Sequence, residues 1–169
     1  VVASQLFKVE VDDRVGQVQE VVQGVNCGAC GYAGCADYAA AVVNGAAVNL
    51  CIPGGAQTAD CVGKIMGVDA EDVVQQKAIV ACQGTLEHRS RSYEYEGIKT
   101  CGASVSLHGG NSSCPYGCLG YGDCKDACRF DAIEIREGIA RVNLDKCTGC
   151  GACEEACPKK VIWIREVSD

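Results

Sequence analysis

Four cysteines fall within eleven residues near the end of the sequence. They are Cys147, Cys150, Cys153 and Cys157, spaced C-x2-C-x2-C-x3-C and followed by Pro158. Three thiolates on one glycine-rich loop can surround one side of a metal cluster, and small neighbouring residues let backbone N–H groups approach its sulfur atoms. Zinc ribbons instead use two C-x2-C pairs separated by a loop. The spacing therefore predicts a [4Fe-4S] cluster.

An internal repeat supplies a second cysteine run of similar length. Cys114, Cys118, Cys124 and Cys128 are spaced C-x3-C-x5-C-x3-C, with Arg129 where the later run has proline. Each run ends in a short helix-like segment and leads to an apolar strand, at 132–135 and 161–164, and GIARVNLD forms a strand between them. Two similar halves indicate a pseudo-two-fold module.

In runs of this kind the fourth cysteine binds the other cluster of the pair. We therefore expect a crossed pairing between the two halves. One predicted cluster is held by Cys147, Cys150, Cys153 and Cys128. The other predicted cluster is held by Cys114, Cys118, Cys124 and Cys157. The stretched spacing constrains Cys114 least.

A third group of cysteines lies in NCGACGYAGC, where Cys27, Cys30 and Cys35 fall within nine residues. An alanine-rich helical segment follows, a turn at Gly45 lets the chain return, and Cys51 comes next. As the fourth cysteine, Cys51 would complete a set of four thiolates after this helix and turn. We predict a third [4Fe-4S] cluster on these four cysteines.

The composition excludes several functions. The net charge of −7 and the lack of a basic run argue against nucleic acid binding. No apolar stretch reaches about 18 residues, the length needed to span a bilayer. Fifteen cysteines in 169 residues fit disulfides, zinc or iron–sulfur clusters, and the odd count weighs against complete disulfide pairing. Without a phosphate-binding glycine fingerprint, we expect no nicotinamide or flavin on this chain.

The remaining pattern predicts an α+β chain in three parts. A helical [4Fe-4S] domain is expected over residues 1–80, a loop-rich linker over 81–113 and a two-cluster ferredoxin-type domain with short strands over 114–169. Within the first part we expect a short strand from Phe7 and then four helices. The helices are expected over 12–24, 36–44, 54–67 and 68–76, and a strand over 77–84.

Two features leave alternatives open. Cys61, Cys82 and Cys101 are either buried small hydrophobic residues or part of a further cluster completed by His88 or His108. The basic side chains beside the runs are either a solvated face or a docking patch for an acidic partner. These are Lys125, Arg129, Lys159 and Lys160.

The order of the motifs resembles one family over nearly all of the chain. FKVEVD, NCGACGYAGCADYAAAV, NLCIPGG and YGCLGYGDC, followed by the ferredoxin run, are similar to the B subunit of the Rnf complex, an ion-translocating ferredoxin:NAD oxidoreductase. The family has Leu-Pro-Gly before the Asn-Cys pair, where this chain has VQG, and that difference affects a turn rather than a ligand.

The resemblance implies an electron-transfer subunit of a membrane-bound translocase, with no reaction on an organic substrate. Soluble ferredoxin would supply electrons, and flavin- and cluster-containing subunits would receive them while Na⁺ or H⁺ crosses the membrane. The family carries an N-terminal membrane helix before FKVEVD. Because this sequence starts without methionine, we expect that segment to be missing here and the chain to act at the cytoplasmic face of the cell (inner) membrane.

Two other interpretations stay open. A related C-x2-C-x4-C-x15-C module occurs in corrinoid iron–sulfur proteins, so the chain could be an electron carrier of a carbon monoxide or corrinoid system. The other interpretation is a zinc- or disulfide-stabilised structural module without a redox role.

Overall fold

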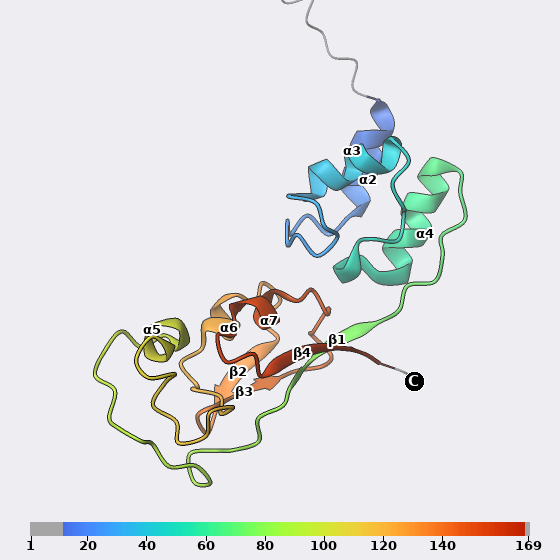
Figure 1. Cartoon of the computed structure of the whole chain (residues 1–169). Coiled ribbons are helices and arrows are strands. Elements are labelled where there is room, and N and C mark those ends of the chain that lie inside the picture. The colour runs from blue at the N-terminus through green and yellow to red at the C-terminus, as the bar shows by residue number, and fades with distance from the viewer. Residues whose placement is uncertain (1–11, 168–169) are drawn as a thin grey trace, which may run out of the picture. The chain divides into compact units, whose positions relative to one another are not determined.

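The computed structural model describes residues 12–167, and the strand expected from Phe7 lies outside this range. The chain forms two compact units that divide between Val73 and Val74. The first unit is helical, and the second combines short helices with paired strands (Figure 1). The predicted α+β class is confirmed. Among residues 12–167, no helix is long and apolar enough to cross a membrane.

Between residues 12 and 73, the N-terminal unit contains three α-helices and one 3-10 turn. They are α2 (Asp13–Val21), α3 (Cys35–Val43), η1 (Ile52–Gly54) and α4 (Gly55–Met66). The apolar faces of the helices meet in one core, in which Tyr38 is the largest fully buried side chain. Its buried members are Val18, Val22, Tyr38, Ala39, Val42, Val48, Cys51 and Val62.

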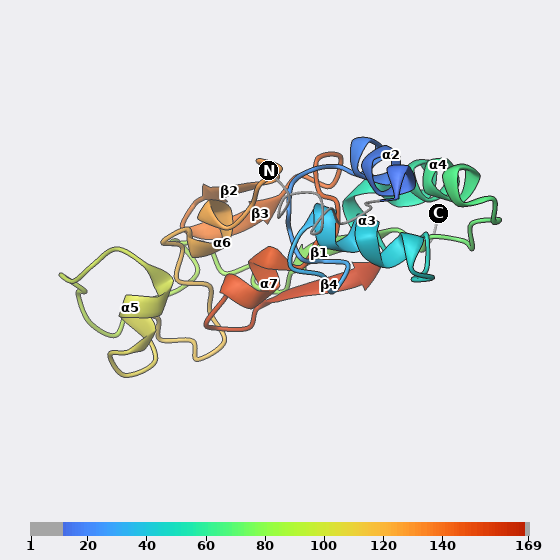
Figure 2. The same cartoon turned by 90° about the horizontal axis from the view of Figure 1, so that it is seen from above.

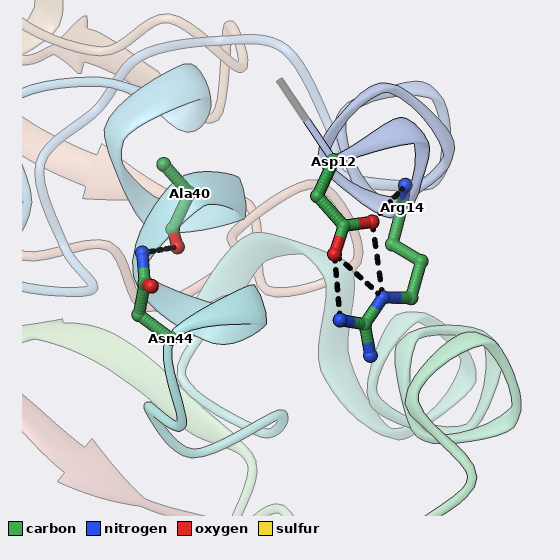
Figure 3. Close-up of polar contacts among 4 residues, drawn as sticks. All are labelled: Asp12, Arg14, Ala40 and Asn44. Atoms are coloured by element: carbon green, nitrogen blue, oxygen red, sulfur yellow. Dashed lines mark hydrogen bonds and ion pairs between the residues drawn. The ribbon is translucent and has the colours of Figure 1, made fainter. Parts of the chain in front are cut away.

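Local side-chain contacts define the helix ends of this unit. The Asp12 carboxylate accepts the Arg14 backbone N–H at 2.9 Å and pairs with the Arg14 guanidinium at 2.6 Å (Figure 3). The side-chain amide of Asn44 donates to the Ala40 carbonyl at 2.8 Å at the end of α3 (Figure 3). Gly67 ends α4 in the left-handed conformation, with φ of 70°. The helix expected over 12–24 is present with Asp12 as its cap, although it ends at Val21, and the expected end of the helix over 54–67 at Gly67 is confirmed.

The helix expected over residues 68–76 is wrong. Residues 68–75 follow α4 without regular structure and lead directly into β1 (Gln76–Val80). Val74 is 53% exposed, so this segment has little apolar surface buried against a neighbour. A nine-residue helix without such packing is not stable in water.

From residue 74 to residue 167, the C-terminal unit is built from two antiparallel strand pairs and three short helices. β1 pairs with β4 (Ile162–Glu166), and β2 (Ile133–Arg136) pairs with β3 (Ile139–Val142). The helices are α5 (Cys101–Val105), α6 (Asp123–Asp126) and α7 (Ala152–Ala156). In both views α5 and the loops around it lie at one end of this unit (Figures 1 and 2).

The β1–β4 pairing joins residues 76–80 to the C-terminal unit. Residues 76–80, which the sequence grouped with the N-terminal domain, pair with the last strand of the chain. Residues 81–113 also lie within the C-terminal unit, where a bridge joins Arg91 to Ser112 and α5 forms. A pairing between segments so far apart in sequence leaves no local sequence signal.

Two glycines let the cysteine loops closely approach β1 and the turn between β2 and β3. Gly149 has φ of 75°, and a Cβ atom there would lie 2.3 Å from the Gln76 carbonyl oxygen. Gly120 occupies the corresponding place in the other half, where a Cβ would lie 2.1 Å from the Gly138 carbonyl oxygen. Any larger residue at either position must push the loop away from the neighbouring backbone.

We expect Gly149→Ala to destabilise the C-terminal unit more than Gly151→Ala. Both glycines have positive φ, so each alanine carries the left-handed penalty of about 1–2 kcal/mol. Only Gly149 adds a backbone clash, because a methyl group added at Gly151 would have nothing within 4 Å. Thermal unfolding of the anaerobic protein measures the difference, and equal melting temperatures for the two variants would contradict the expectation.

Candidate metal centres

The N-terminal cysteines surround one cavity. Cys27 and Cys30 lie on the glycine-containing loop before α3, Cys35 begins α3, and Cys51 precedes η1. All four line the same cavity, together with Gln23, Val25, Asn26 and Tyr38 among others. The Asn26 side-chain oxygen accepts the Cys35 N–H at 2.8 Å, which fixes the loop to the start of the helix.

Tyr38 holds the returning segment that carries Cys51. Its hydroxyl donates to the Ala47 carbonyl at 3.0 Å and accepts the Leu50 N–H at 3.3 Å. Burial raises the pKa of Tyr38 to about 12, so the hydroxyl keeps its proton near neutral pH. Backbone amides of Gln23 and Gly54 face the Cys51 thiol.

A second cavity lies between the later cysteine run and the strands of the C-terminal unit. It is lined by the thiol-bearing residues Cys128, Cys147, Cys150 and Cys153. The Ala78 N–H on β1 donates to Cys147 Sγ at 3.4 Å, and the Ala132 N–H donates to Cys128 Sγ at 3.4 Å. The rest of the lining is mainly apolar and includes Phe130, Ile133 and Ile164.

A third cavity lies beside α6 in the same unit. It is lined by Cys118, Cys124, Cys157 and Cys101, with Leu119, Val161 and Ile162 as apolar neighbours. Backbone amides of Ala140 and Gly120 face the Cys118 thiol. Cys157 therefore lies with Cys118 and Cys124 rather than with Cys153, and Cys128 lies with the later run.

The structure places Cys114 apart from the other predicted ligands. Cys114 is exposed and is not among the residues that line the third cavity, whereas Cys101 is buried there. The stretched C-x3-C spacing leaves Cys114 outside the tight loop. The other eleven predicted ligands line one of the three cavities, and their role as ligands stays a prediction.

The other residues for which the sequence left two interpretations lie in different parts of the structure. Cys61 lies on α4 in the N-terminal unit, and Cys82 packs against the core of the C-terminal unit near Cys118. His88 and His108 are both exposed.

Two of the basic side chains beside the runs bond to backbone carbonyl groups. Lys159 Nζ donates to the Gly109 carbonyl at 2.9 Å, and Lys160 Nζ donates to carbonyls of α7.

The donor sets fit iron–sulfur clusters. Each cavity offers four thiols, mostly apolar walls and backbone N–H groups near sulfur, which are the features that clusters use. Burial raises the thiol pKa of Cys51, Cys101 and Cys118. It raises the pKa of Cys124 to about 12 and that of Cys153 to about 11. Metal binding favours the thiolate form that burial disfavours. Within residues 12–167, no three His, Cys, Asp or Glu side chains are close enough to hold a single metal ion.

Two protein families match parts of the chain. Residues 23–53 match the family described as "Putative Fe-S cluster", and residues 140–163 match the "4Fe-4S binding domain" family. The first match contains the whole N-terminal cysteine set, and the second contains the later run. Both support iron–sulfur binding by these segments.

Curated relatives cover most of this chain. It is 46% identical over 87% of its length to the B subunit of the Na⁺-translocating ferredoxin:NAD⁺ oxidoreductase complex of Acetobacterium woodii. It is 43% identical over 96% of its length to the B subunit of the proton-translocating complex of Clostridium ljungdahlii, and 39% identical over 88% to that of the ion-translocating complex of Methanosarcina acetivorans. The chain spans 45%, 58% and 57% of these relatives, respectively.

We expect Tyr38→Phe to loosen the N-terminal site. The change leaves the Leu50 N–H without its acceptor, which costs about 1–3 kcal/mol for a buried group and less for this half-buried one. A chelator should then remove iron from this site faster, measured by iron release over time. Tyr32→Phe is the control, because it removes a hydroxyl from the neighbouring ring, 5.6 Å away between centroids. Equal release rates for both variants would count against the role of Tyr38.

The crossed arrangement predicts which thiols Cys157→Ala exposes. Alkylation of the anaerobic protein, read by mass spectrometry, should newly label Cys118 and Cys124. It should leave Cys147 and Cys150 as protected as in the unaltered chain. Cys153→Ala is the matched control and should give the opposite pattern. New labelling of Cys147 in the Cys157→Ala protein would overturn the crossed pairing.

Proposed function

We propose that this chain, a homologue of the B subunits of ion-translocating ferredoxin:NAD⁺ oxidoreductase complexes, carries electrons within such a complex. The observation that carries the proposal is the set of three cavities, each lined by four cysteines. The N-terminal unit would hold one [4Fe-4S] cluster and the C-terminal unit two. A bound [4Fe-4S] cluster takes up and releases single electrons.

The residues of the chain would hold the clusters, exclude water and set their potentials. Apolar walls such as Phe130 and Ile164 limit solvent access, and N–H groups such as that of Ala78 lie at ligand sulfur atoms. Solvent access and hydrogen bonds to sulfur are two of the factors that determine cluster potential. No side chain needs to act on an organic substrate in this role.

The names of the relatives support a choice of partners. Those proteins are named as subunits of ferredoxin:NAD⁺ oxidoreductases that translocate Na⁺ or protons. We propose that soluble ferredoxin delivers electrons to this chain and that flavin- and cluster-containing subunits of the same complex receive them. The chain would work at the cytoplasmic face of the cell membrane, beside the ion-translocating subunits. The relatives favour this role over that of an electron carrier for a carbon monoxide or corrinoid system.

The test is the metal content and electron uptake of the anaerobically purified chain. We expect about twelve irons and twelve sulfides per chain, as for three [4Fe-4S] clusters, with little zinc. Chemically reduced ferredoxin should then bleach the visible absorbance of the oxidised protein. A chain that holds zinc in place of iron, or holds clusters that ferredoxin does not reduce, would contradict the proposal.

A further inference from the structure

The two halves of the C-terminal unit differ at one ligand position. CLGYGDCKDAC, residues 118–128, and CTGCGACEEAC, residues 147–157, have equal length, and three cysteines match in place. The glycines match as well, and all four have positive φ. Tyr121 stands where the later run has Cys150. The first loop therefore lacks its middle thiol, and the sequence shows this as soon as the halves are aligned in this register.

The structure places a distant cysteine beside the gap. Cys101, the first residue of α5, has 9% of its surface exposed and lines the cavity of the first run. Backbone amides of Tyr121, Gly122 and Asp123 face its thiol. These residues form the part of the loop where the middle cysteine is missing. The Cys101 thiol thus lies against the part of the loop that would carry the middle cysteine.

Asp123 fastens α5 to this loop. Its carboxylate accepts the Cys101 N–H at 2.6 Å and the Gly102 N–H at 2.9 Å. Backbone amides of the loop approach the Cys101 sulfur in return, so the contact is reciprocal. Thr100 adds a local cap, because its hydroxyl accepts the Ala103 N–H at 3.2 Å. These bonds orient the start of α5 so that Cys101 lies within the cavity.

The remaining nearby cysteines do not fill the gap. Cys114 is exposed, and its backbone N–H donates to the Ser112 hydroxyl at 3.3 Å. Cys82 lies close enough to Cys118 to interact electrostatically, and it is half-buried against the core rather than in the cavity lining. Cys101 is the one of these three that lies among the other thiols.

We propose that Cys101 is the fourth ligand of the cluster held by Cys118, Cys124 and Cys157, and that Asp123 is the residue that positions it. The inference rests on the proposed function, because it concerns a cluster that function requires. It assigns residues 81–113 a part in cofactor binding. It leaves Cys114 as a free surface thiol.

The experiment compares Cys101→Ala with Cys114→Ala and Cys82→Ala in the full chain, purified anaerobically. Cys101→Ala should lower the iron content from about twelve to about eight per chain, or to about eleven with the electron paramagnetic resonance signal of a three-iron centre. The two control variants should keep about twelve. Full iron in Cys101→Ala, or loss in Cys114→Ala, would overturn the inference.

A measurement on the unaltered chain covers the case in which Cys101→Ala fails to fold. In the loaded protein Cys114 should react with iodoacetamide at once, and Cys101 should react only after a chelator has removed iron. Reaction of Cys101 in the fully loaded protein would contradict a ligand role. An unaltered chain without iron–sulfur clusters would instead refute the proposed function itself, so the two failures are distinguishable.

Asp123→Asn tests the positioning role. An amide oxygen cannot replace both carboxylate oxygens as acceptors for two N–H groups, so the third cavity should release its iron to a chelator several-fold faster. The paramagnetic spectrum of that cluster should also change while those of the other two do not. Asp126→Asn on α6 removes the same charge at an exposed site and is the control. Identical spectra and release rates for the two variants would remove Asp123 from the proposal.

Discussion

Contacts between cysteine sulfur atoms and backbone N–H groups organise the C-terminal unit. Ala78 on β1 donates to Cys147 Sγ, and Ala132 donates to Cys128 Sγ, so strands and ligand loops meet at sulfur. The buried core of this unit consists of cysteine, alanine, valine and isoleucine side chains, with Phe130 only partly buried at its edge. Elsewhere large aromatic residues dominate core energetics. Here much of the interior is lined by thiols, so the stability of the unit depends on what those thiols hold.

The same interior links folding to cofactor binding. Burial raises the pKa of Cys124 to about 12 and that of Cys153 to about 11, because an apolar interior disfavours the bare thiolate. Metal ligation requires that thiolate, and binding free energy then becomes folding free energy. The apolar walls that disfavour a bare charge also restrict water around a bound cluster, and solvent exposure is one determinant of its potential. Stability and redox tuning therefore depend on the same residues.

Features that depend on near neighbours in sequence were predictable. Asp12 caps α2, Gly67 ends α4, and eleven cysteines chosen from their spacing line the three cavities. Features that depend on tertiary contact were missed. Residues 68–75 form no helix and leave Val68 and Val74 about half exposed, and β1 joins a strand at the far end of the chain. The place of Cys101 beside Cys118, Cys124 and Cys157 was not predicted, because spacing rules consider only nearby residues, although Tyr121 in the register of Cys150 was a usable signal.

The distant origin of Cys101 has an entropic consequence. A middle ligand inside the loop would be three residues from Cys118, whereas Cys101 must be brought back across the much longer segment that contains α5. Closing that longer loop costs about 1–2 kcal/mol more chain entropy by the logarithmic length rule. The two bonds that Asp123 accepts at 2.6 and 2.9 Å offset this cost, since hydrogen bonds to charged groups contribute about 1.5–3 kcal/mol each. A carboxylate that bonds to the backbone of α5 thereby sets the effective concentration of a thiol at the third cavity.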